Sequence, residues 1–359
     1  MGDARPLPAQ HHAQLLHPRT TGCDRRLPDV RAMILLVTPA ARAAPTSVHG
    51  NDVTARRWQS ILGELGCDVR VTNGYEPGDY AALIALHARK SADAIRTFHA
   101  EHPGAPIVLA LTGTDLYPDL VTSGVDPDIL ALANRIVVLQ PHALAQLDDE
   151  QRARTTVIVQ SMPDIPYETP RHDAFEVAVL AHLRDVKDPL RTAEASRLLP
   201  ADSRVVVSHA GAPLQDDLAR LAREESTRNP RYRWLGEQPR AEALRLLARS
   251  KLLVLTSHDE GGANVVSEAI AAGVPVLSSD IPGSRGLLGD DYPGYFPVGD
   301  TEALAEALHA AETDHNRYYQ RLRETCERLH DLVAPQKERA AWSDVLTELS
   351  LPVPRPVAS

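Results

Sequence analysis

The chain has 359 residues, which is enough for two domains that each bury a sizeable core. Its 43% hydrophobic and 24% charged residues are ordinary for a globular protein, and its formal net charge of -10 argues against a nucleic-acid-binding function. The three cysteines have neither disulfide-framework nor metal-binding spacing, and no apolar run approaches the roughly 18 residues of a membrane span, so we expect a cytoplasmic protein that binds no membrane.

The first 32 residues differ from the rest of the chain. They are rich in Pro, His and Arg and contain neither the apolar segment nor the small-residue cleavage site of a signal peptide. We interpret residues 1–32 as a disordered extension or a mis-assigned start, because the first convincing strand begins at Met33.

From Met33 onward, short apolar runs alternate with helical patterns. The first series predicts strands at 33–38, 69–72, 80–86, 107–111, 135–139 and 156–159, with helices such as 54–65 and 92–102 between them. A second series predicts strands at 175–181, 204–209, 232–235, 252–256, 275–278 and 295–298, with helices at 189–199, 214–229, 241–250 and 264–272. The pattern indicates an α/β fold with parallel sheets covered by helices on both faces.

The proline-rich segment 162–173 separates the two series and is interpreted as a linker. We therefore predict two doubly wound Rossmann-like domains, 33–165 and 173–335, that face each other across a cleft, followed by a C-terminal helix and tail, 336–359.

Ligands of such sheets bind at the carboxyl ends of the strands, so the polar segments there are the candidate site. In the first domain these segments are His49-Gly50-Asn51, His87-Ala88-Arg89-Lys90-Ser91 and Thr112-Gly113-Thr114-Asp115, and Gln140 and Gln160-Ser161 end two more strands. For any one of them taken alone, a turn with a helix cap is an equally good interpretation. Ser91 is a candidate cap of that kind.

The segment 258–283 carries the strongest signal. Gly261 and Gly262 follow a predicted strand and precede a helix that opens near Ala263, where free backbone N–H groups and the positive end of the helix dipole can receive a phosphate. Glu260 and Glu268 have seven residues between them, about 12 Å along a helix, which suits the length of a nucleotide sugar. Two solvated glutamates at an ordinary turn are the usual explanation of an isolated pair with this spacing.

A cationic loop follows the first strand of the second domain. Arg184 and Lys187 would lie at the cleft and balance the charge of a diphosphate, although a pair of solvated loop cations is the alternative. Asp188 and Pro189 are predicted as the N-cap and first residue of the next helix.

Two other motifs are set aside. Asp126-Pro127-Asp128 has the spacing of a metal-binding DxD motif but is better explained as a helix start. No G-x-G-x-x-G follows either first strand, which argues against a dinucleotide dehydrogenase.

The two glutamates with the upstream Arg/Lys pair resemble the E-x7-E motif and diphosphate-binding residues of GT-B glycosyltransferases, which use nucleotide-sugar donors. More narrowly, several strings resemble the selenosugar synthases of selenoneine biosynthesis: GNDVTARRW at 50–58, LHARKSA at 86–92, LTGTDLY at 111–117, VVLQ at 137–140, HLRDVKDP at 182–189, YRWLG at 232–236, EGGANVVSEA at 260–269 and DYPGYFPVGD at 291–300. The strings of the first domain narrow the resemblance to the selenosugar synthases, because the strings of the second domain are shared with many GT-B enzymes.

The resemblance implies that a UDP-sugar, UDP-N-acetylglucosamine or UDP-glucose, reacts with selenophosphate to form a C–Se bond, with loss of UDP and phosphate. It implies no metal or other cofactor. It also implies donor-site roles: Glu268 at the ribose, Arg184 and Lys187 at the diphosphate, Gly236 and its neighbours near the uracil, Glu260 near the sugar, and the backbone of Gly261, Gly262, Ala263, Asn264 and Val265 at the distal phosphate. From the residues themselves we expect Gly50, Asn51 and the Gly113-Thr114 turn to hold the donor from across the cleft.

The residues themselves suggest where selenophosphate would bind. His87, Arg89 and Lys90 form a cationic set at one strand end, and Thr112, Gly113, Thr114 and Asp115 follow the next predicted strand. Charge-assisted hydrogen bonds from such a set can hold an oxyanion. Selenolate is a strong nucleophile, so we expect catalysis by positioning, with Glu260, Lys187, Arg184 and Asn51 as the catalytic set and His49 as an additional proton donor or base.

Two alternatives to a selenosugar synthase stay open. One is an ordinary glycosyltransferase with a hydroxyl acceptor, and the other is a non-catalytic sugar-nucleotide sensor. We expect small-molecule substrates, with functional neighbours in selenoneine biosynthesis. His258-Asp259 departs from the family pattern, which leaves the preferred UDP-sugar open, and the sequence leaves open the stereochemistry and the oligomeric state.

Overall fold

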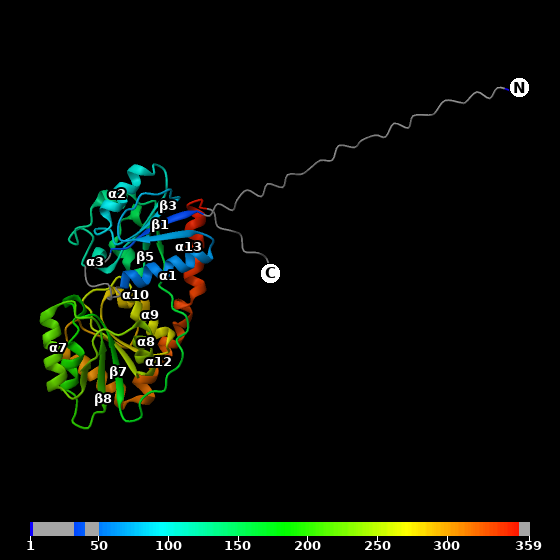
Figure 1. The fold of residues 1–359 in the computed structure, drawn as a ribbon. Coiled ribbons are helices and arrows are strands. Elements are labelled where there is room, and N and C mark those ends of the chain that lie inside the picture. The colour runs from blue at the N-terminus through cyan, green and yellow to red at the C-terminus, as the bar shows by residue number, and fades with distance from the viewer. Residues whose placement is uncertain (3–31, 40–49, 352–359) are drawn as a thin grey trace. The chain divides into compact units, whose positions relative to one another are not determined.

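The computed structural model describes residues 1–2, 32–39 and 50–351. His49, the tail after residue 351 and the predicted N-terminal extension therefore lie outside the described residues, except that Met1, Gly2 and Ala32 of the extension are described. The described chain forms two parallel sheets of six strands each with helices around them, which confirms the predicted fold class (Figure 1).

The first sheet has the strand order β2-β1-β3-β4-β5-β6. Its strands are β1 (Met33–Val37), β2 (Asp68–Thr72), β3 (Ala82–Leu86), β4 (Ile107–Ala110), β5 (Arg135–Val138) and β6 (Thr155–Val157). Every pairing is parallel, and β3 and β4 are buried along their whole length, as expected for strands covered on both faces. The helices of this domain are α1 (Gly50–Glu64), α2 (Ala92–Glu101), α3 (Gly113–Leu116), α4 (Pro127–Leu132), η1 (Pro141–Gln146) and α5 (Asp149–Ala153).

The second sheet has the order β12-β11-β10-β7-β8-β9. Its strands are β7 (Phe175–Leu180), β8 (Val205–Ala210), β9 (Tyr232–Trp234), β10 (Leu252–Leu255), β11 (Val276–Ser279) and β12 (Tyr295–Phe296). Around it lie η2 (Asp185–Lys187), α6 (Arg191–Arg197), α7 (Asp216–Arg228), α8 (Arg240–Arg249), α9 (Asn264–Ala271), α10 (Pro282–Leu288), α11 (Thr301–Thr313), η3 (His315–Tyr319), α12 (Gln320–Arg328) and η4 (His330–Val333).

The last helix, α13 (Pro335–Glu348), returns to the first domain and lies beside α1 (Figure 1). Its Trp342 is fully buried and packs edge-on against Trp58 of α1, with ring centroids 4.7 Å apart. The end of the chain therefore belongs to the core of the first domain, although the preceding helices surround the second sheet.

Each predicted strand has a counterpart within two residues of its expected start. The predicted cap at Asp188 is wrong: this residue has φ 42 and ends η2, and the next helix begins at Arg191. The Thr256 hydroxyl donates to the carbonyls of Lys187 and Asp188, and Arg191 Nε donates to the Asp188 carboxylate at 2.8 Å, so one long-range and one local contact fix this turn. The capping interpretation of Asp126 is confirmed, because its side chain accepts from the Asp128 N–H.

Within the described residues, the structure contains no helix with both the length and the hydropathy needed to cross a bilayer.

Candidate active site

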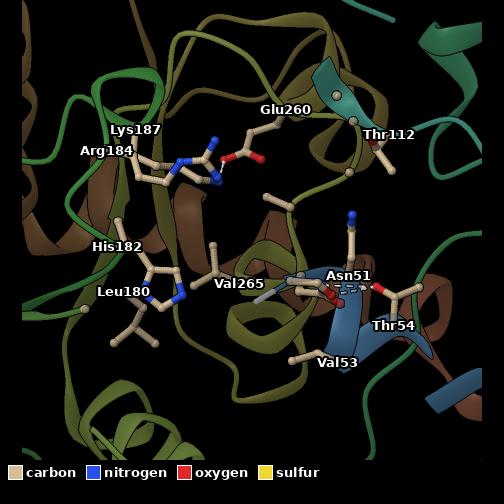
Figure 2. Close-up of a pocket in the computed structure, with 18 of the residues that line it drawn as sticks. Asn51, Val53, Thr54, Thr112, Leu180, His182, Arg184, Lys187, Glu260 and Val265 are labelled. Atoms are coloured by element: carbon tan, nitrogen blue, oxygen red, sulfur yellow. Dashed lines mark hydrogen bonds and ion pairs between the residues drawn. The ribbon is translucent and has the colours of Figure 1, made fainter. Parts of the chain in front are cut away.

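A cavity of about 860 Å³ lies where residues after the strands of both sheets come together (Figure 2). Most of the predicted site residues line it: Gly50, Asn51, His87, Lys90, Thr112, Gly113, Thr114, Arg184, Lys187, Glu260, Gly261, Gly262, Ala263, Asn264, Val265 and Glu268. Segments more than 200 residues apart in the sequence thus form one site, as the strand-end rule predicts.

Three predicted residues are placed differently. Among the described residues, those that line the cavity do not include Arg89, Asp115 or Gly236. Asp115 is completely buried, and Gly236 contributes its carbonyl to the Gly211 N–H while its neighbours Glu237 and Gln238 reach the cavity. His49 lies outside the described residues.

Glu260 is held by two donors. Lys187 Nζ forms an ion pair with Glu260 Oε1, and the Ser257 hydroxyl donates to the same oxygen at 2.7 Å. Figure 2 shows Arg184 and Lys187 extending toward Glu260. The predicted diphosphate-binding cations and the first glutamate of the motif therefore form one charged cluster at the cavity.

Glu268 lies on α9 and also lines the cavity. Its side chain is 9% exposed and pairs with Arg240 at the start of α8, with 2.8 Å between Nη1 and Oε1. The pair fixes the Glu268 carboxylate at the wall of the cavity.

The first turn of α9 faces the cavity without a side-chain cap. The N-cap position is Ala263, which offers no side-chain acceptor, and Gly261 and Gly262 precede it. The uncapped N–H groups of this turn are suited to receive the oxygens of a phosphate.

The loop that carries Arg184 is supported by His209. Its Nε2 lies 2.8 Å from the Ala181 carbonyl, which can only accept, so Nε2 carries the proton and Nδ1 accepts from Tyr232 Oη at 2.8 Å. Complete burial lowers the pKa of His209 to about 4. The neutral ring thus fixes the end of β7, directly before His182 of the cavity wall.

On the first-domain side, His87 has an unusual backbone conformation, with φ 71. Its Nδ1 lies 2.6 Å from Asp115 Oδ1, and its Nε2 lies 3.1 Å from the Thr114 hydroxyl. Asp115 also accepts from the N–H groups of Ala88 and Thr112, and these groups with His87 hold its pKa below the ordinary value although burial alone would raise it. The Asp115 carboxylate therefore orients His87 toward the cavity.

Lys90 lies at the boundary between the domains. Its pKa is lowered first by partial burial and then by the cations Arg184 and Arg89, and Asp115 only partly opposes this effect. Arg184 belongs to the second domain, so the two domains present like charges to each other at the cavity. An anion between Lys90 and Arg184 would relieve this repulsion.

Ser91 occupies the N-cap position of α2 as predicted, but its hydroxyl donates to the Leu86 carbonyl at 2.7 Å and forms no cap bond. It therefore closes the turn that carries His87.

Gln160, one of the polar residues at the predicted strand ends, and Glu237, the neighbour of Gly236, also line the cavity. His182, Gln238 and Arg240 line it too and were not predicted. His182 follows a predicted strand and Arg240 follows Pro239 at a helix start, so their positions relative to these elements were the available signal.

A protein-family model matches most of the second domain. Residues 164–328 match the family model of glycosyl transferases group 1. No curated protein sequence matches the chain.

Solved structures share the fold of both domains. HepE from Anabaena, crystallised with UDP-glucose, is 15% identical with a TM-score of 0.68, over 89% of this chain and 100% of that one. Sucrose-phosphate synthase from Thermosynechococcus elongatus is 17% identical with a TM-score of 0.64, over 89% of this chain and 99% of that one. The UDP-forming α,α-trehalose-phosphate synthase from Burkholderia vietnamiensis is 14% identical with a TM-score of 0.62, over 85% of this chain and 81% of that one. These similarities establish the two-domain GT-B fold.

Proposed function

We propose that this chain, a glycosyltransferase of the GT-B fold with a group 1 domain over residues 164–328, is a selenosugar synthase. It would join the anomeric carbon of a UDP-sugar, UDP-N-acetylglucosamine or UDP-glucose, to the selenium of selenophosphate. The C–Se bond forms as the bond between the anomeric carbon and UDP breaks, and water takes the phosphoryl group from selenium as the Se–P bond breaks. The 1-seleno-sugar would serve selenoneine biosynthesis.

The second domain supports the donor assignment. Lys187 and Arg184 offer positive charge beside the uncapped first turn of α9, as a diphosphate requires. Glu268 offers carboxylate oxygens about one helical turn further along, which suits ribose hydroxyls. HepE, which shares the fold, was solved with UDP and with UDP-glucose.

The observation that carries the acceptor assignment is the pairing of like charges across the cavity. Lys90 and Arg184 approach from opposite domains, and His87 and the Gly113-Thr114 turn lie at the same end of the cavity. A small oxyanion such as selenophosphate matches this surface better than an uncharged hydroxyl acceptor, because it neutralises both cations.

The proposed reaction does not need a strong general base. The selenium of selenophosphate is already a strong nucleophile, so the site needs to align it with the anomeric carbon and to stabilise the departing UDP. Lys187 and Arg184 would supply the second effect, and Glu260 would orient both Lys187 and the donor sugar. We propose that no metal takes part, which a turnover assay with and without a chelator checks.

The His87–Asp115 pair favours a second candidate, an O-glycosyltransferase. A His held by a buried carboxylate beside the exposed Thr114 hydroxyl is suited to accept the proton of a hydroxyl acceptor.

The test is mass spectrometry of products from UDP-N-acetylglucosamine with and without selenophosphate, repeated with UDP-glucose. A hexosamine or hexose with the selenium isotope pattern supports the selenosugar synthase. UDP formed from either donor with no selenium in the product contradicts it and directs attention to hydroxyl acceptors.

A further inference from the structure

Two adjacent arginines of α1 differ completely in their surroundings. Arg56 is exposed, whereas the side chain of Arg57 is 14% exposed and lies between the two domains. Arg57 does not line the cavity among the described residues. Its contacts nevertheless lead to the segment that would bind the donor phosphate.

One end of the Arg57 guanidinium faces the second domain. Nη2 donates to Asn264 Oδ1 at 2.9 Å and also to Gln160 Oε1. The Gln160 amide in turn donates to the Gly262 carbonyl at 3.0 Å, and the Thr54 hydroxyl donates to Gln160 at 2.7 Å. Arg57 thus holds residues 262–264, directly or through Gln160.

The other end of the guanidinium faces a buried carboxylate on α13. Arg57 Nε lies 3.2 Å from Glu338 Oε2, and Glu338 also accepts from Trp58 Nε1 at 2.8 Å and from the Ser161 N–H at 2.8 Å. Burial lowers the pKa of Arg57, and Glu338 partly offsets this effect. The cation is therefore anchored in the first domain while it reaches into the second.

The contact with Arg57 affects the first residue of α9. Asn264 begins the helix, where an asparagine side chain can satisfy free backbone N–H groups. Here its Oδ1 accepts from Arg57. Arg57 thereby keeps the acceptor atom of Asn264 away from the N–H groups of the first turn.

We propose that Arg57 is a positioning residue that sets donor affinity through Asn264: it fixes the start of α9 so that its first turn is open to the donor phosphate. The inference rests on the proposed donor site but not on the identity of the acceptor.

The test is the affinity for UDP, measured by calorimetry, together with the melting temperature. R57K keeps the charge but loses the fork that spans Glu338 and Asn264, so we expect UDP to bind about tenfold more weakly. The exposed neighbour provides the matched control, and R56K should bind UDP like the wild type. An R57K protein that binds UDP normally would overturn the proposal.

A double-mutant cycle separates positioning from general loosening of the fold. In an N264A background the further loss caused by R57K should shrink to less than about twofold, because its partner is gone. An equal loss in both backgrounds would overturn a role through Asn264. If R57K does not fold, E338Q, which weakens the anchor of the guanidinium, replaces it, and unchanged UDP affinity again contradicts the proposal. A wild-type protein that does not bind UDP removes the donor assignment itself.

Discussion

The backbones of Gly113 and Gly261 meet directly across the two domains. A Cβ added to Gly113 would lie 2.5 Å from the Gly261 nitrogen, closer than real side-chain atoms come to backbone. Gly113 opens α3 and Gly261 precedes α9, so both glycines lie at the cavity wall. Their missing side chains allow the acceptor and donor sides of the site to approach each other.

G113A should therefore force the two domains apart at the cavity. We expect turnover to fall about 100-fold, because small misplacements of reacting groups have effects of this size. Steady-state kinetics give this quantity. G63A is the matched control, since a Cβ at that helical glycine meets nothing within 4 Å, and wild-type turnover in G113A would contradict the close approach.

The Lys187–Glu260 pair gives a second prediction. K187A removes one of the two cations expected at the diphosphate and leaves Glu260 with one donor of the two described, so turnover should fall by about 100-fold or more. K337A removes a lysine that is 56% exposed and serves as the control. Equal kcat/KM values for K187A and K337A would exclude a role of Lys187 in catalysis.

The pH dependence of acceptor binding should report on Lys90. Its lowered pKa means that its charge is lost at a lower pH than that of an exposed lysine, so the KM for selenophosphate should rise as the solution becomes alkaline. K90R keeps the charge and should remove this rise. KM values between pH 7 and pH 10 test the prediction, which identical profiles for wild type and K90R would contradict.

His209 gives a prediction about stability. Its pKa is about 4 in the folded protein and 6.5 in the reference state, so between these values the unfolded chain binds more protons. Stability should therefore fall as the pH decreases from 6.5 to 4, by roughly 3 kcal/mol from this residue. H209Q should show a shallower decrease in urea midpoints over this range, and H99Q, at an exposed histidine, serves as the control. An unchanged slope in H209Q would contradict the assignment.

The sequence predicted the sheets because buried parallel strands are continuous apolar runs, as in β3 and β4. It also predicted most of the residues that line the cavity, since Gly261-Gly262 before a helix and polar residues after strands have local signatures.

Contacts over long sequence distances were beyond such reasoning. Arg57 and Asn264 are 207 residues apart, and Trp58 and Glu338 are 280 apart, so neither contact leaves a local pattern. The left-handed Asp188 was missed for a related reason: the sequence Asp-Pro is a good helix start, but Thr256 and Arg191 impose another turn. Arg89 and Asp115 were predicted at the site because they belong to motifs that reach the cavity. Asp115 is instead buried beneath the cavity-lining residues, where it bonds to His87, Ala88 and Thr112.

Whether a small selenium-containing oxyanion is the sugar acceptor is tested by the rate of UDP formation from the UDP-sugar as selenophosphate is varied, with phosphate as the control anion. The proposal predicts saturable UDP formation that requires selenophosphate and yields one seleno-sugar for each UDP. UDP formation at the same rate with phosphate, or without any added anion, would contradict it.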